Sequence, residues 1–246
     1  MRFFVGMHQP SSARYVGPAF ISINRLRDRK RAFEVGDWIM DSGAFTSIAK
    51  HGGYPEAPEV YATQIKRWST NGNLLAAVAQ DYMCEPHMLE RTGLTVQEHQ
   101  RLTIQRYDAL TDCDTGGIYV MPVLQGYSAG EYLDHLRMYG DRLPHGAWVG
   151  VGSVCKRNGD PMAIVMVLSA IKHARPDLRL HGFGLKTTAL HRSAVRALLH
   201  TADSMSWSFA ARKQGRNAND PREAASYQDM IQRYDPQPDL LTLMVA

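Results

Sequence analysis

Four short motifs of this chain carry groups suited to acid–base and nucleophilic chemistry, and each comes at the end of a short apolar run. They are Asp41-Ser42-Gly43-Ala44-Phe45, Gln80-Asp81-Tyr82-Met83-Cys84, Val123-Leu124-Gln125-Gly126 and Ala202-Asp203-Ser204-Met205-Ser206-Trp207. In a parallel α/β barrel the C-terminal ends of all strands open on one face, so polar groups at those ends converge in one pocket. The sequence therefore predicts a site built from carboxylates, one Gln amide and several glycines.

Each polar group in these motifs also has a purely structural interpretation. Asp41 suits an active-site base, but its local sequence is also typical of an Asx-turn or a helix cap. Asp81 could accept two adjacent donors of a purine-like base, or it could cap a helix. Gln125 could read a carbonyl and an N–H together, or it could be an ordinary loop residue. Asp203 could attack a sugar C1′, or it could lie in a turn before a strand.

Two Gly-x-Gly pairs fall inside strand-like segments. They are Gly150 with Gly152 and Gly182 with Gly184. Glycine weakens a strand, but it lets a flat ligand or another backbone approach closely. The pairs therefore indicate either a binding surface or tight packing within a barrel.

Basic residues form two clusters, and each follows a strand-like segment. The first cluster contains Arg25, Arg27, Arg29, Lys30 and Arg31, and the second contains Arg212, Lys213 and Arg216. Such a cluster is usually a solvated face. Its place after a strand, however, also favours phosphate contacts at the mouth of a barrel.

The composition is that of a globular protein with an ordinary core. The 246 residues are 44% hydrophobic and carry a formal net charge of +4, which permits a nucleic-acid partner without requiring one. Cys84, Cys113 and Cys155 are odd in number and far apart, which argues against a disulfide framework or a Cys-type zinc site and fits a reducing, cytoplasmic compartment.

Membrane and metal motifs are missing from the sequence. The first seven residues are too short an apolar run for a signal peptide, and there is no run of 18 apolar residues. His8, His51, His181 and His191 show no metal-binding spacing, so we expect no metal cofactor.

Strand-like and helix-like segments alternate along the chain. We expect strands at Phe3–Met7, Ala19–Asn24, Trp38–Asp41, Leu75–Gln80, Ile118–Leu124, Ala147–Gly152, Arg179–Gly184 and Ser204–Ser208. We expect helices at Pro58–Thr70, Thr95–Leu110, Ala129–Tyr139, Pro161–Ala174 and Thr188–His200.

Eight strands alternating with helices predict an α/β fold, a compact and irregular (β/α)8 barrel in a single domain of residues 1–246. The connection from Met7 to Ala19 is too short for a normal helix, hence the irregularity. A polar tail should begin at about residue 213 and hold one helix near Asp220–Arg233. A doubly wound open sheet is the alternative, but no Gly-x-Gly-x-x-Gly follows the first strand.

Taken together, the motifs resemble those of the tRNA-guanine transglycosylase superfamily. Asp41-Ser42-Gly43-Ala44-Phe45 is similar to that family's Asp-Ser-Gly-Gly-Phe, and Asp81 with Cys84 to its base-recognition segment. Gln125-Gly126 resembles its Val-Gln-Gly-Gly, and the segments at 149–152 and 180–184 resemble its two glycine-rich strands. The segment from Asp203 to Arg212 resembles, without a gap, the archaeal segment that begins at the nucleophilic Asp.

The chain departs from the tRNA enzymes in two respects. It has no Cys beyond Cys155, so we expect it to lack their zinc site, and because its 246 residues are much fewer, we expect no appended RNA-binding domain. This minimal form most resembles the DpdA type of phages and bacterial modification clusters, which places 7-deazaguanine derivatives in DNA.

The resemblance implies a pentosyltransferase that exchanges guanine in DNA for a free 7-deazaguanine base. Asp203 would be the nucleophile and Asp41 the proton carrier. The implied substrate-binding residues are Asp81, Gln125, Gly126, Gly150, Gly152, His181 and Gly182. The DNA would be flipped or single-stranded at the target, and the protein would lie in the cytoplasm, that of the host if a phage encodes it. Two alternatives stay open: a minimal tRNA-type transglycosylase, and an inactive barrel that binds a nucleobase or nucleic acid.

Overall fold

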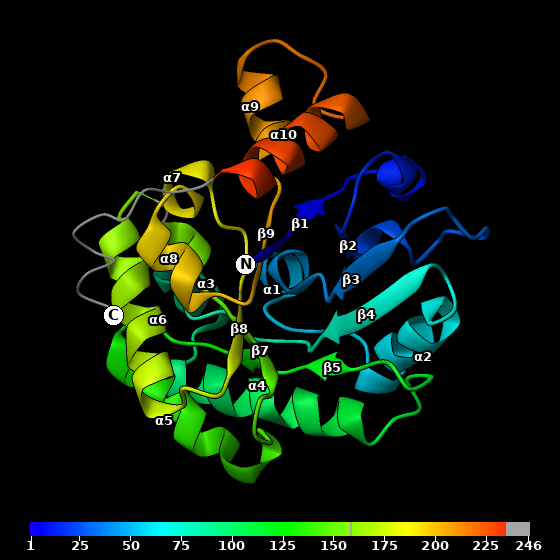
Figure 1. Cartoon of the computed structure of the whole chain (residues 1–246). Coiled ribbons are helices and arrows are strands. Elements are labelled where there is room, and N and C mark those ends of the chain that lie inside the picture. Colours follow the sequence, from blue (N-terminus) through cyan, green and yellow to red (C-terminus); the bar gives the residue numbers. More distant parts are fainter. Residues whose placement is uncertain (158, 235–246) are drawn as a thin grey trace.

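Short apolar segments of the chain pair side by side as parallel strands and close into a nearly complete barrel (Figure 1). The computed structural model describes residues 1–157 and 159–234. The strands are β1 (Arg2–Gly6), β2 (Ala19–Ser22), β3 (Asp37–Asp41), β4 (Asn73–Val78), β5 (Val120–Met121), β6 (Val123–Leu124), β7 (Trp148–Val151), β8 (Arg179–Gly182) and β9 (Thr201–Ser204).

The ring of strands follows the order β5-β4-β3-β2-β1-β9-β8-β7-β6, and all pairs are parallel. β5 and β6 are two parts of one passage of the chain, separated only by Pro122. Proline has no N–H to donate to a neighbouring strand, so the passage is interrupted there. Because β5 pairs with β4 and β6 pairs with β7, this passage closes the ring. The α/β barrel prediction is confirmed.

Helices surround the barrel and border its C-terminal face. They are α1 (Ala44–His51), α2 (Pro58–Trp68), α3 (Pro86–Thr92), α4 (Val96–Thr111), α5 (Ala129–Tyr139), α6 (Pro161–Ala174), α7 (Thr187–Leu190), α8 (Ser193–Leu198), α9 (Ser206–Lys213) and α10 (Pro221–Arg233). Short 3₁₀ helices are η1 (Pro10–Tyr15), η2 (Ile23–Arg25), η3 (Gly140–Arg142) and η4 (Val154–Arg157). Among the described residues, no helix has the length and apolar character needed to cross a membrane.

Local sequence explains where two of the long helices begin. Thr95 accepts a hydrogen bond from the Glu98 N–H, and the Glu98 side chain accepts one from the Thr95 N–H, so a capping box starts α4. Ser128 and Glu131 form the same arrangement at the start of α5.

Along each strand, side chains point alternately into the barrel and outward toward the helices. Phe4, Ile39, Met121, Val123 and Trp148 are buried together inside the barrel. The alternate side chains of the same strands, such as Phe3, Val5, Trp38 and Met40, pack outward against the helices. This alternation leaves the C-terminal strand ends free to carry polar groups.

Two sequence-based predictions need correction. The eighth strand is Thr201–Ser204 rather than Ser204–Ser208, and the residues after it form α9. The alternating Ser-Met-Ser-Trp-Ser pattern imitates a strand, but Trp207 turns inward and its indole N–H donates to the Gly6 carbonyl at 2.8 Å. The helix expected over Thr188–His200 is two helices, α7 and α8.

The predicted helix near Asp220–Arg233 is present as α10, but it is more than a surface tail. It packs against β1 and η1, and Figure 1 shows it beside β1. Gln228 accepts a hydrogen bond from the Gly17 N–H at 2.7 Å and donates to the Pro18 carbonyl at 2.8 Å. The helix therefore closes the outer layer where the first and last strands meet.

Candidate active site

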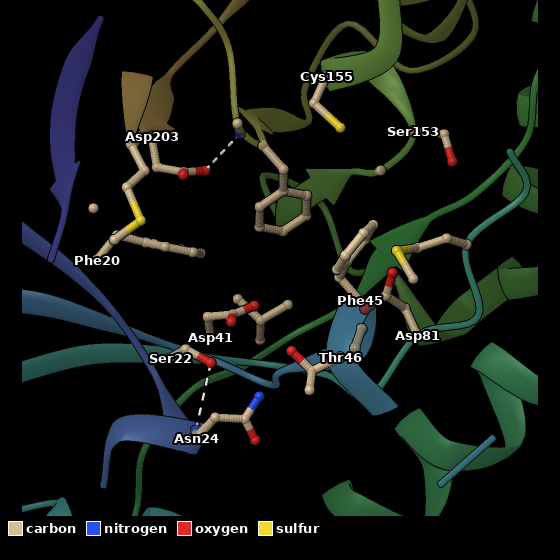
Figure 2. Close-up of a pocket in the computed structure, with 18 of the residues that line it drawn as sticks. Phe20, Ser22, Asn24, Asp41, Phe45, Thr46, Asp81, Ser153, Cys155 and Asp203 are labelled. Carbon is tan, nitrogen blue, oxygen red and sulfur yellow. Dashed lines mark hydrogen bonds between the residues drawn. The ribbon is translucent and has the colours of Figure 1, made fainter. Parts of the chain in front are cut away.

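A cavity of about 710 Å³ opens at the C-terminal ends of the strands. Asp41 at the end of β3, Asp81 beyond β4, Gln125 beyond β6 and Asp203 in β9 all line it. Figure 2 shows Asp41, Asp81 and Asp203 around the same space. The four predicted polar groups, which are separated by up to 162 positions (203 − 41) in the sequence, thus meet in one site.

Asp203 is held on one side and open on the other. Asp203 is only 6% exposed. Its Oδ1 atom accepts a hydrogen bond from the Gly184 N–H at 3.0 Å, which is drawn as a dashed line in Figure 2. The same oxygen lies 3.3 Å from Nε2 of His181. Because both contacts use Oδ1, the carboxylate is oriented while Oδ2 is left for a reacting atom.

His181 is a buried link between the barrel interior and Asp203. Its Nδ1 lies 2.8 Å from the Thr201 hydroxyl, which in turn accepts from the Trp148 indole N–H at 2.8 Å. Since indole can only donate, the Thr201 proton points to Nδ1, and the network assigns the ring proton to Nε2, facing Asp203. His181 is therefore a positioning residue, and it does not line the cavity.

Asp41 is half-buried and lines the cavity. The Ser22 hydroxyl and the Gly43 N–H both hydrogen-bond to its carboxylate. Burial is the main reason that the pKa of Asp41 rises from 3.8 to about 6, and the nearby negative charge of Asp203 raises it further. A carboxyl group with such a pKa can both give and take a proton near neutral pH.

Asp81, Gln125 and Ser153 form a hydrogen-bonded chain along one wall. The Gln125 amide donates to the Asp81 carboxylate and accepts from the Ser153 hydroxyl at 2.8 Å. Ser153 also accepts from the Cys84 N–H at 3.2 Å. Burial raises the pKa of Asp81 from 3.8 to about 7, and the charges of Asp41 and Glu85 add to the effect.

Of the four glycines predicted to bind the substrate, one lines the cavity and three do not. Gly152 lines it, and a Cβ there would lie 2.0 Å from the Gln125 amide nitrogen. A Cβ at Gly150 would lie 2.3 Å from the Phe183 ring, and one at Gly182 would lie 2.8 Å from Leu185. Gly126 packs against the start of α5. These three glycines allow close packing around the site rather than contact with a ligand in the cavity.

Two aromatic residues on opposite sides of the cavity were missed by sequence reasoning. Phe20 follows the inward alternation of β2, and its ring stacks on His181 with centroids 5.6 Å apart. Phe45 lies at the start of α1 and is 55% exposed. Figure 2 shows both rings beside the space between the carboxylates. Phe45 belongs to the Asp41 motif, but aromatic residues after a strand occur in many cores, so no sequence signal singled it out.

The basic residues reach the cavity mouth only in part. Arg25 lines the main cavity, and Arg25 and Arg212 together line an adjoining hollow of about 330 Å³ with His8. Burial lowers the pKa of His8, and the charges of Arg25 and Arg212 lower it further. Lys50, which we did not predict, also lines the main cavity.

Other predicted basic residues have protein partners. Arg27 forms an ion pair with Glu56, and Arg216 forms one with Glu223. Lys213 lies over the Phe209 ring at 5.0 Å.

Arg29 donates to the Arg31 carbonyl and lies over Phe33. The Phe33 N–H donates to the Asn71 side-chain oxygen just before β4. The chain that follows the first basic cluster therefore runs toward the N-terminal ends of the strands. Arg29 also lines a further hollow of about 330 Å³ with His8 and Arg25, so this residue lies near the cavity mouth.

No three His, Cys, Asp or Glu side chains of residues 1–157 and 159–234 are grouped as metal ligands would be. Cys155 lines the cavity, while Cys84 is buried and Cys113 lies elsewhere. The absence of zinc stays a prediction, which elemental analysis of the purified protein can test.

These features define an α/β-barrel protein with a carboxylate-rich pocket at the C-terminal face of its strands. The model of the DpdA family, described as DeoxyPurine in DNA protein A, matches residues 1–229, and the chain belongs to that family. A comparison with curated proteins finds no match.

Proposed function

We propose that this protein is a transglycosylase that exchanges guanine in DNA for a 7-deazaguanine derivative. The observation that carries the proposal is Asp203, whose carboxylate is oriented through Oδ1 at the edge of a cavity that also contains Asp41 and Asp81. Membership of a family described by deoxypurines in DNA favours DNA as the nucleic acid.

The first step breaks the glycosidic bond. Oδ2 of Asp203 attacks C1′ of the target nucleotide, and the C1′–N9 electron pair leaves with guanine. The protonated form of Asp41 supplies a proton to the departing base. The products of this step are free guanine and a sugar–Asp203 ester, as in a retaining glycosidase.

The second step attaches the new base to C1′ and releases Asp203. The N9–H proton of the incoming 7-deazaguanine passes to Asp41, and N9 attacks C1′ as the bond to Asp203 breaks. Asp203 leaves as a carboxylate and Asp41 is protonated again, so the enzyme returns to its starting state. One group with a pKa of about 6 can serve both steps.

Base selection follows from the wall opposite Asp203. The Asp81 carboxylate accepts from the N1–H and N2–H donors of guanine or 7-deazaguanine, and the second N–H of the Gln125 amide donates to O6. Phe20 and Phe45 offer faces for stacking a flat ring. Adenine presents the opposite donor and acceptor pattern and should be rejected.

Duplex DNA does not expose C1′ to such a pocket, so the target nucleotide must be flipped out or lie in a single strand. Arg25 and Arg212 flank the cavity mouth beside His8 and would hold the phosphates next to that nucleotide. In this proposal, Arg27, Lys213 and Arg216 contribute less because they already have protein partners.

The test is a base-exchange assay with labelled guanine, run in parallel on double-stranded DNA, single-stranded DNA and tRNA. We expect release or incorporation of label with DNA and none with tRNA. Exchange on tRNA alone would instead identify a minimal tRNA-type enzyme. Binding of nucleic acid without any exchange would identify an inactive barrel.

A further inference from the structure

The outer side of α9 presents an aromatic ring to solvent beside the candidate active site. Phe209 is 53% exposed and, unlike Phe45, is not one of the residues that line the main cavity. Because α9 begins soon after β9 ends, this ring comes shortly after Asp203 in the chain. Single exposed apolar residues are common on proteins, so a role for Phe209 has to follow from what surrounds it.

The inner side of α9 fixes the helix firmly to the barrel. The Trp207 indole N–H donates to the Gly6 carbonyl at 2.8 Å, and the Ser208 hydroxyl lies 2.9 Å from Nε2 of His8. The helix also packs against α10, which lies beside it in Figure 1. Phe209 therefore projects from a helix that is anchored on its opposite side.

The outer side of α9 is basic as well as aromatic. Arg212 follows Phe209 by one turn of the helix, and Nζ of Lys213 lies 5.0 Å from the centre of the Phe209 ring. Neither Asp nor Glu occurs between Asp203 and Asp220. This segment therefore does not neutralise its own positive charge, and such a surface attracts a polyanion.

Arg212 connects this surface with the mouth of the cavity. It lines the hollow of about 330 Å³ that also contains His8 and Arg25, and those two residues line the main cavity as well. A DNA strand whose phosphates lie beside Arg25 and Arg212 places its bases next to α9. Phe209 precedes Arg212 along the helix, so it lies nearer the end of β9 that carries Asp203.

A second copy of this chain fits the same surface less well than DNA does. A two-fold contact through α9 would bring the positive charges of Arg212 and Lys213 in both copies together. One exposed ring is also far smaller than the roughly 1,200 Å² that a specific protein–protein contact buries. DNA, in contrast, offers negative charge to the basic residues and stacked bases to the ring.

Flipping a guanine out of a duplex breaks its stacking and leaves a gap between the neighbouring bases. Proteins that distort DNA often insert an apolar side chain such as Phe at a broken base step. We propose that Phe209 enters the base stack of duplex DNA as the target guanine leaves it, so that α9 opens the duplex for the pocket. The inference rests on the proposed function, because it takes guanine in DNA as the target.

The experiment measures exchange of labelled guanine on three forms of one DNA sequence. They are a perfect duplex, the same duplex with an abasic site opposite the target guanine, and the single strand. Phe209→Ala should lower kcat/KM on the perfect duplex at least about tenfold, because no side chain then fills the gap in the stack. The loss should be smaller on the abasic duplex, and within about twofold on the single strand, where no base pair has to be broken.

Three further variants identify the cause of the loss. Phe209→Leu keeps an apolar side chain and should retain most of the activity on the duplex. Lys213→Gln removes the cation over the ring and should leave the ratio of duplex to single-strand activity unchanged. Met230→Ala is the matched control, because Met230 is an apolar residue of α10 that is 42% exposed, and it should behave as the wild type on all three forms.

The outcomes separate this inference from the proposed function. An equal loss on duplex and single strand in Phe209→Ala, an unchanged rate on the duplex, or an equal duplex loss in Met230→Ala would overturn the role of Phe209 alone. Exchange by the wild-type protein on single strands only would overturn it too. Wild-type dimers that Phe209→Ala dissociates, measured by sedimentation, would assign the ring to a contact between copies instead. Absence of exchange on every DNA form would overturn the proposed function itself.

Discussion

The side chain of Gln125 occupies the space beside Gly152, so closely that a Cβ at position 152 would lie 2.0 Å from the amide nitrogen. The glycine is therefore needed for the Gln125 amide to reach Asp81 and Ser153. Beside it, the Tyr132 hydroxyl donates to the Gly152 carbonyl at 2.6 Å and holds this stretch of backbone in place.

Gly152→Ala should displace Gln125 and weaken binding of the free base. The lost contact leaves a buried donor or acceptor unpaired, which costs roughly 1–3 kcal/mol, or about 5- to 150-fold in affinity. Calorimetry with 7-deazaguanine measures the effect. Gly36→Ala is the matched control, because no heavy atom lies within 4 Å of a Cβ there.

A double-mutant cycle identifies the cause. Once Gln125→Ala has removed the side chain, Gly152→Ala should add little further loss, because there is no amide left to displace. Additive losses would mean that Gly152 acts on the base independently of Gln125.

Asp203→Asn should abolish exchange and leave the fold intact. The substitution keeps the size of the side chain and can keep the Gly184 N–H contact, but an amide does not attack C1′. Wild-type protein incubated with DNA and then denatured should carry covalently attached DNA, and the variant should not. Asp134→Asn, at an exposed position on α5, is the control. Full exchange activity in Asp203→Asn would remove Asp203 as the nucleophile.

Asp81→Asn should make the protein more stable at alkaline pH. The pKa of Asp81 is about 7 in the folded protein against 3.8 as the ordinary value, so between these values the folded state keeps a proton that the unfolded chain has lost. The stability from this proton is complete below pH 3.8 and is lost as the pH rises through about 7. Asparagine has no such loss and can still accept from Gln125.

The size of the gain follows from the pKa. One pKa unit is worth about 1.4 kcal/mol, so the gain at about pH 8 should be on the order of a few kcal/mol, or at least about 5 °C in Tm. At about pH 4 the wild-type protein and the variant should differ little. Thermal unfolding at both pH values checks this, and a constant difference would mean that the proton on Asp81 does not control stability.

The two half-reactions should depend on pH in opposite directions. Guanine release needs protonated Asp41, so its rate should fall as the pH rises through about 6, while attack by the incoming base needs the carboxylate and should become faster. Single-turnover measurements at saturating base separate the two steps. Asp41→Asn should slow both steps and remove both pH dependences. Parallel pH profiles for the two steps would assign the proton transfer to another group.

The sequence predicted the barrel well because the spacing of apolar residues differs between strand segments and helix segments, and the two kinds of segment alternate along the chain. The bounds of α5 and α6 agree with the prediction, since capping residues and proline begin these helices clearly. The position of β9 was missed because Thr201–Ser204 is a short strand with few apolar residues, whose pairing with β1 and β8 is visible only in three dimensions.

The candidate site was predicted unevenly for a similar reason. Asp41, Asp81, Gln125 and Asp203 carry a local signal, a polar group that follows an apolar run, and all four line the cavity. Glu85 has no such signal, because a Glu before Pro86 looks like any helix start. The role of His181 as a support for Asp203 depends on pairing between β8 and β9, which no single segment encodes.

Arg25 and Arg212 should together account for much of the salt dependence of DNA binding. Each phosphate contact adds about 0.9 to the slope of log K against log salt for duplex DNA and about 0.7 for single strands. The double variant Arg25→Ala/Arg212→Ala should therefore flatten the slope by about 1.4–1.8, and the preference for guanine should survive because phosphate contacts do not read sequence. Binding measured over a salt series tests this. The control Arg137→Ala/Arg233→Ala removes the same charge on the outer helices. This control should keep nearly the wild-type slope, and an equal flattening in the two double variants would mean that the effect comes from net charge rather than from a phosphate site beside His8.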